Sequence, residues 1–88
     1  MRPITVRTFG SVAALVGFGE AIVSCDGPLP LAAILDVLGN RYPVFSSYLS
    51  RGDAEDNLMI CCGDQKLHVD SMVQPGAELL LITPIAGG

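Results

Sequence analysis

The sequence has few of the residues that bind nucleic acids or metals. Its 88 residues include five Lys and Arg against nine Asp and Glu, and a single His, for a formal charge of -4. A nucleic-acid-binding surface needs a basic face, so we expect no nucleic-acid partner. His68 has no cysteine or carboxylate at metal-ligand spacing, and a metal site is therefore not expected.

Cysteine is also scarce, and long apolar runs are missing. Three cysteines, two of them adjacent at Cys61 and Cys62, do not suit a disulfide framework and are fewer than the four thiolates of a ferredoxin cluster. Cys61 and Cys62 fall on one expected strand, so we predict buried structural thiols that point to opposite faces. No apolar stretch approaches the ~18 residues that span a bilayer, and the N-terminus lacks the apolar core of a signal peptide. We expect a cytoplasmic protein with no membrane partner.

The chain is short but hydrophobic enough to fold. Half of its residues are hydrophobic and 16% are charged, which is far from the composition of disordered chains. A chain of this size forms one domain and buries only about 60–65% of its unfolded surface, which leaves little room for an enclosed pocket. We therefore do not expect a self-contained enzyme.

The first half of the sequence predicts two strands and two helices. Alternating apolar residues predict a strand over residues 4–9, helical spacing predicts a short extra helix over residues 12–16, and a second strand is expected over residues 20–25. The main helix is expected to begin near Pro30 and to end before Pro43, because proline suits a first helical position and disfavours helical geometry in the residue before it. Its apolar face is formed by Leu31, Ile34, Leu35 and Leu38.

The second half predicts a loop, a hairpin and a last strand. Residues 44–57 are interpreted as a surface loop, residues 58–69 as a hairpin, and residues 79–82 as a central strand that is apolar on both faces. Met72 and Val73 are expected in the core. One mixed sheet of four to five strands under one main helix buries these faces with the first and last strands parallel and adjacent. The predicted fold is α+β, a β-grasp over residues 1–84 with a short extra helix.

The sequence ends in Gly87-Gly88 directly after the last strand. Two glycines bury no area, so a disordered tail is the simplest interpretation. A diglycine has no Cβ, however, and can pass through a narrow channel into another protein. We expect residues 85–88 to form a flexible tail. Ile85, Ala86 and Gly87 would pass through such a channel, and the Gly88 carboxylate would react in the partner's active site. The activating partner would use ATP and Mg²⁺ to form an acyl-adenylate, which a sulfur or nitrogen nucleophile then attacks, and the carrier itself would bind no cofactor.

The last strand also predicts a docking surface. A single helix covers one face of a small sheet, so one apolar pair of this strand is expected to face outward beside the tail. We assign Leu79 and Leu81, together with Phe9, as partner-docking residues. The alternative is that both faces are covered, one of them by the segment around Phe45 and Tyr48.

Three stretches together resemble the small, sulfur-carrying subunit of molybdopterin synthase. They are FGSVAALVG at residues 9–17, a helix that ends in RYP at residues 41–43, and TPIAGG at residues 83–88. Related carriers for thiamin synthesis are shorter and lack the helix near residues 12–16. The resemblance implies a ubiquitin-like β-grasp, an E1-like adenylyltransferase and sulfurtransferase as the activating partner, and the large subunit of molybdopterin synthase as the sulfur acceptor.

Alternatives to this hypothesis stay open at the level of sequence. The carrier could serve another pathway, such as thiamin or cysteine synthesis, because Cys62-Gly63 stands where the family usually has Asn-Gly. The same activated terminus would also suit a ubiquitin-like modifier that is joined to lysines through Gly88. A third alternative is a β-grasp interaction module whose tail is inert.

Overall fold

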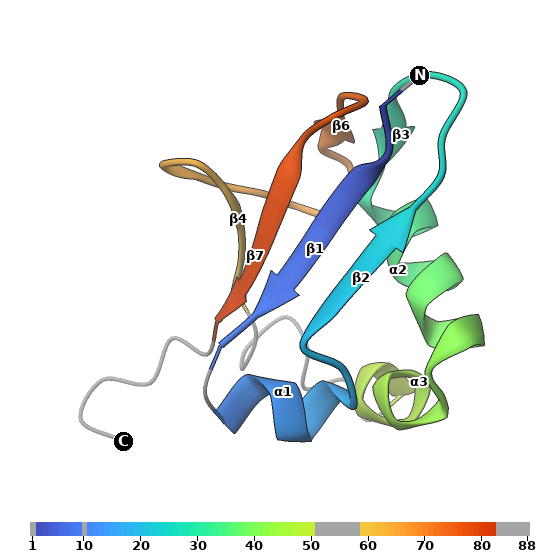
Figure 1. The fold of residues 1–88 in the computed structure, drawn as a ribbon, viewed down its shortest axis with the longest axis vertical. Helices are drawn as coiled ribbons and strands as arrows, with labels where there is room; N and C mark the ends of the chain where they lie inside the picture. The colour runs from blue at the N-terminus through green and yellow to red at the C-terminus, as the bar shows by residue number, and fades with distance from the viewer. Residues whose placement is uncertain (1, 10, 51–58, 83–88) are drawn as a thin grey trace.

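The computed structural model describes residues 2–9, 11–50 and 59–82, which form a five-stranded sheet, a two-stranded sheet and three helices (Figure 1). The elements in chain order are β1 (Ile4–Thr8), α1 (Ser11–Val16), β2 (Glu20–Val23), β3 (Leu29–Pro30), α2 (Leu31–Arg41), α3 (Pro43–Ser50), β4 (Met59–Cys62), β5 (Gln65–Lys66), β6 (Met72–Val73) and β7 (Glu78–Ile82). The strand order is β2-β1-β7-β4-β5 in the larger sheet and β3-β6 in the smaller one. None of the described helices is long and apolar enough to cross a membrane.

The larger sheet has the first and last strands side by side at its centre. β1 and β7 are parallel, with Val6 opposite Leu79 and Thr8 opposite Leu81. The other neighbours in this sheet, β1 with β2, β7 with β4 and β4 with β5, are antiparallel. This arrangement confirms the predicted β-grasp topology, with the sheet at the upper end of the predicted four to five strands.

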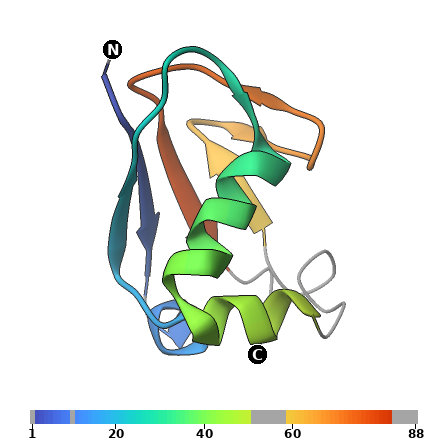
Figure 2. The same ribbon diagram turned by 90° about the vertical axis from the view of Figure 1, so that its right-hand side faces the viewer.

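The core lies between the sheet and α2, which crosses one face of it (Figure 2). Leu31, Ile34 and Leu38 of α2 are buried, as their helical spacing predicts. Leu35 is half-buried and packs against the margin of the same cluster. Opposite them lie the inward side chains of the sheet, which include Ile4, Val6, Ala21, Val23, Ile60, Leu79 and Leu81. The predicted helix face is therefore correct, with Leu35 at its edge.

A third helix replaces the first part of the loop that was predicted over residues 44–57. α3 begins at Pro43, because the fixed φ of proline suits the first position of a helix. The same proline disfavours helical geometry at Tyr42, so α2 ends just before it. Phe45 on α3 is fully buried and meets the Phe18 ring edge-on at 5.8 Å between centroids. The Tyr42 ring stacks on the other side of this cluster, 4.5 Å from Phe18. The loop prediction was wrong here because it treated Pro43 only as the residue that ends the preceding helix. The rest of the predicted loop, residues 51–57, lies outside the described part of the chain.

The predicted hairpin is present but shorter, because the chain after it caps α2. β5 ends at Lys66, and the Val69 and Ser71 carbonyls accept hydrogen bonds from the main-chain N–H groups of Ala32 and Leu31. Those N–H groups in the first turn of a helix have no partner within it. Residues 69–71 are thereby drawn away from β4 and toward the start of α2.

The segment after this cap forms β6, which pairs with β3. Val73 enters the core as predicted, whereas Met72 points outward with 56% of its surface exposed. Met72 was placed in the core because its partner strand β3 could not be seen in the sequence. On a strand neighbouring side chains alternate, so only one of the two can be buried.

Candidate functional site

The candidate site is the end of β7, where the described chain stops at Ile82. Leu79 and Leu81 are 1% exposed, because they point inward and pack under α2. Their assignment as docking residues was therefore wrong. The other pair, Leu80 and Ile82, lies on the outer face of the sheet and is half-buried.

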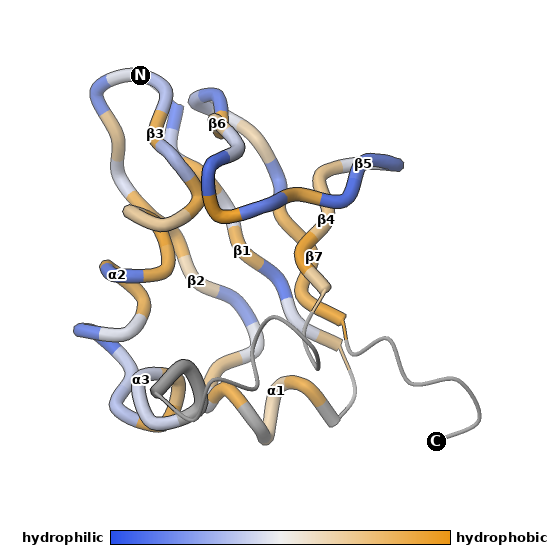
Figure 3. The backbone as a smooth tube through the Cα atoms, turned by 180° about the vertical axis from the view of Figure 1, so that it is seen from behind, coloured by the Kyte–Doolittle hydropathy of each residue, from blue (hydrophilic) through white to orange (hydrophobic). Residues whose placement is uncertain are grey.

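Neighbouring side chains extend this pair into an apolar surface. Cys61 is opposite Leu80 and Met59 is opposite Ile82 in the antiparallel pairing of β4 with β7. Ile60 between them is buried, so Met59 and Cys61 share the outer face with Leu80 and Ile82. We call these four residues the outer patch. The hydrophobic character of β4 and β7 is visible in Figure 3.

A charged residue in the sequence marked the outer side of β7. Glu78 shares the period of two with Leu80 and Ile82, and it is exposed. A charged side chain is rarely buried, so the face of a strand that carries one is expected to point to solvent, together with every second residue that follows. The alternation from Glu78 was thus the signal that could have identified the outward pair.

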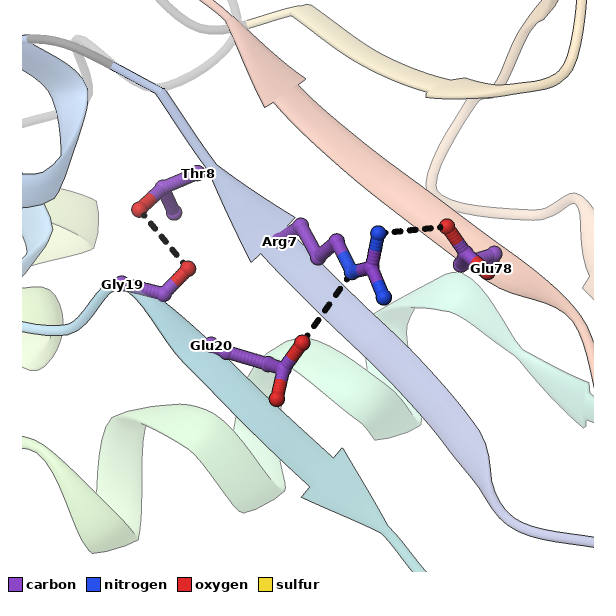
Figure 4. A network of polar contacts seen from close by, with 5 residues as sticks. All are labelled: Arg7, Thr8, Gly19, Glu20 and Glu78. Carbon is purple, nitrogen blue, oxygen red and sulfur yellow. Dashed lines mark hydrogen bonds and ion pairs between the residues drawn. The ribbon is translucent and has the colours of Figure 1, made fainter.

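Phe9 follows β1 and is 59% exposed, and its role in docking stays a prediction. The preceding residue, Thr8, is buried and anchors this end of β1. Its Oγ1 lies 2.7 Å from the Phe18 carbonyl oxygen and 3.2 Å from that of Gly19, and its main-chain N–H donates to the Gly19 carbonyl (Figure 4). Thr8 is also opposite Leu81, so the ends of β1 and β7 are held in register.

Charged side chains lie next to the outer patch. The Arg7 guanidinium contacts Glu20 through Nε at 3.1 Å and Glu78 through a second nitrogen at 3.2 Å, which links three strands (Figure 4). Arg7 is opposite Leu80, so this group borders the patch. Two carboxylates against one guanidinium leave this border with a negative charge.

The other residues considered from the sequence do not form a site in the described part of the chain. Cys25, Cys61 and Cys62 are free thiols and half-buried instead of fully buried. Cys62 packs against the core while Cys61 lies in the outer patch, so the two point to opposite faces as predicted. His68 is exposed, and no three metal-binding side chains cluster among the residues described. The tail residues Ile85, Ala86, Gly87 and Gly88 lie outside the described residues.

Comparison with solved structures places this geometry in a known fold. The small archaeal modifier protein SAMP1 from Haloferax volcanii is 23% identical, with a TM-score of 0.79 over 98% of this chain and 99% of that one. A protein from Pyrococcus furiosus assigned as molybdopterin converting factor, subunit 1, is 14% identical, with a TM-score of 0.74 over 97% of this chain and 100% of that one. SAMP1 from Methanosarcina acetivorans is 17% identical, with a TM-score of 0.72 over 100% of this chain and 98% of that one.

These similarities show the fold, which is a ubiquitin-like β-grasp, as the residue pattern and the resemblance predicted. No protein-family model matches the chain, and no curated protein matches it by sequence.

Proposed function

We propose that the protein is a sulfur carrier that reacts through the carboxylate of Gly88. The observation that carries this proposal is the position of β7 at the centre of a ubiquitin-like sheet. Residues 83–88, which include Gly87-Gly88, follow this strand directly. A central strand is held on both sides, so its end is a rigid point from which a tail can be presented. The likeness in fold to a molybdopterin converting factor subunit favours molybdopterin synthesis as the pathway that receives the sulfur.

The proposed chemistry needs only a carboxylate from this chain. An oxygen of the Gly88 carboxylate attacks the α-phosphorus of ATP on the activating enzyme, which uses Mg²⁺, and pyrophosphate leaves. The terminal sulfur of a persulfide on the partner then attacks the carbonyl carbon of the acyl-adenylate, AMP leaves, and an acyl disulfide forms. A thiol reductant cleaves its S–S bond, which leaves a thiocarboxylate on Gly88 and returns the partner's cysteine as a disulfide with the reductant or as a thiol. The carrier itself is not the enzyme in this sequence of steps.

The outer patch supports docking of the activating enzyme. Only Thr83 and Pro84 separate its last residue, Ile82, from the tail, so a protein that takes the tail into its active site meets the rest of the outer patch on the same side of the sheet. Phe9 and the negative border around Arg7 lie beside the patch. We therefore propose an activating enzyme with an apolar contact surface and basic groups at its rim.

A ubiquitin-like modifier is the second candidate function. The observation that favours it is the similarity in fold to two proteins named small archaeal modifier proteins. In this alternative the Gly88 acyl group is transferred from the adenylate to the ε-amine of a lysine on a target protein, AMP leaves, and Gly88 ends in an isopeptide bond.

Intact mass distinguishes these functions. The protein is incubated with an E1-like adenylating enzyme, ATP and a sulfur donor. Exchange of one oxygen for sulfur on Gly88 is expected of a carrier, and covalent adducts to other proteins are expected of a modifier. An unchanged mass would contradict both and leave an interaction module. A Cys→Ser variant at all three cysteines is expected to accept sulfur as the wild type does, because the reacting atom belongs to Gly88.

Tail and patch variants test the two parts of the site separately. Deletion of Gly88 is expected to abolish adenylation and leave the melting temperature unchanged, because the carboxylate moves by about 3.3–3.6 Å along the channel. Leu80→Glu is expected to raise the KM of adenylation through lost docking. Met72→Glu is the matched control, because it adds the same charge at an exposed apolar position on β6, which belongs to the other sheet. Equal effects of the two Glu variants would refute docking at the outer patch.

A further inference from the structure

Among the strands that the structure describes, β2 is outermost, and no described strand pairs with its second edge. The Gly19 carbonyl faces β1, since it accepts a hydrogen bond from the Thr8 N–H. Main-chain groups of an antiparallel strand alternate between its two sides. The N–H and C=O of Ile22 therefore face away from β1, toward the open edge. The side chain of Ile22 is 52% exposed, so an apolar group lies next to these main-chain groups.

Arg41 occupies the hydrogen-bond acceptor at this edge, which is the carbonyl oxygen of Ile22. Its guanidinium donates a 2.7 Å hydrogen bond to the Ile22 carbonyl oxygen from the last turn of α2, which lies beside β2 in both Figure 1 and Figure 2. Arg41 belongs to the RYP segment that the sequence singled out. The other two residues of that segment have structural roles, because Tyr42 stacks on Phe18 and Pro43 begins α3. The covering bond from Arg41 is not needed by the helix or by the β1–β2 pairing.

An open strand edge is a template for pairing with another chain, and proteins blunt such edges with charged side chains. We propose that Arg41 is a guard that keeps β2 from pairing with β2 of a second copy of this chain. The geometry of Ile22 selects that occupant. Two β2 strands aligned antiparallel about Ile22 would exchange both N–H···O bonds across a two-fold axis. Their exposed Ile22 side chains would then lie against each other on one face.

This inference does not depend on the chemistry proposed for Gly88. A change in electrostatic attraction between copies would not explain self-association of a variant that lacks Arg41. Loss of Arg41 takes the formal charge from -4 to -5, which increases the repulsion between copies. Association of a variant that lacks Arg41 would therefore report the opened edge and not a gain in electrostatic attraction.

The test compares Arg41→Ala with wild type and with Arg2→Ala, which loses the same charge from an exposed side chain outside β2. Light scattering coupled to size-exclusion chromatography gives the molar mass over a wide concentration range. Wild type and Arg2→Ala are expected to remain monomeric, and Arg41→Ala is expected to approach twice the monomer mass. Hydrogen exchange then locates the contact, and the Ile22 amide is expected to become protected as the Arg41→Ala concentration rises.

Three results would overturn the proposal. The first is an Arg41→Ala variant that stays monomeric at the highest concentration. The second is association with an Ile22 amide that exchanges as in the monomer, because the contact would then lie elsewhere. The third is association of Arg2→Ala to the same extent, because the effect would follow from the charge alone.

Discussion

Two leucines of α2 provide a matched test of how this helix packs on the sheet. Leu38 is fully buried and Leu35 is half-buried, and Leu→Ala removes the same atoms from each. A fully buried Leu→Ala change costs about 2–5 kcal/mol, and half of the burial implies about half of that cost at Leu35. About 1 kcal/mol shifts the Tm of a domain of this size by about 4–8 °C, so we expect Leu38→Ala to lower the Tm by at least about 8 °C.

Urea denaturation followed by far-UV circular dichroism measures this difference. The midpoint is expected to fall further for Leu38→Ala than for Leu35→Ala at an unchanged slope, because the surface exposed on unfolding stays nearly the same. Both changes give the helix the same gain in intrinsic propensity, so that contribution cancels between them. Equal losses, or a larger loss at Leu35, would mean that α2 is rotated about its axis relative to the packing described above.

Three further changes test single features of the fold. Thr8→Val removes the donor to a buried carbonyl and is expected to cost about 1–3 kcal/mol in the same urea assay; a smaller loss would show that the hydroxyl does not anchor β1. Gly76 has a φ of +83°, so Gly76→Ala is expected to lower stability by about 1 kcal/mol or more, and an unchanged Tm would contradict this turn geometry. Arg7→Met is expected to cost less than about 1 kcal/mol, because both of its ion pairs are exposed, and the difference should shrink in high salt.

Local patterns in the sequence predicted most of the elements, because they depend on near neighbours along the chain. Helical spacing of apolar residues identified α2, and alternation identified β1. The Pro75-Gly76 turn follows the same logic, since its positive φ requires glycine at that position. The prediction failed at α3 and at Met72, where the deciding contacts come from distant parts of the chain. Phe45 is buried by Phe18, and Met72 is exposed because its strand pairs with β3.

The candidate site divides in the same way. Gly87-Gly88 and the apolar character of β7 are properties of the sequence, and so is the carrier chemistry that they suggest. The outward pair of β7 was assigned wrongly, because a strand that is apolar on both faces looks the same under a shift of one residue. Glu78 offered a signal in the sequence, and the placement of α2 over one face of the sheet shows that Leu79 and Leu81 are the covered pair.

The sequence by itself therefore determined most of the elements, their order and the Gly87-Gly88 motif, since these follow from spacing and residue type. The tertiary structure alone decided that Arg7 joins three strands and that Arg41 reaches the carbonyl of Ile22. Those features join residues that are far apart in the chain. Their proximity follows from how the helix and strands pack together, and no local pattern records it.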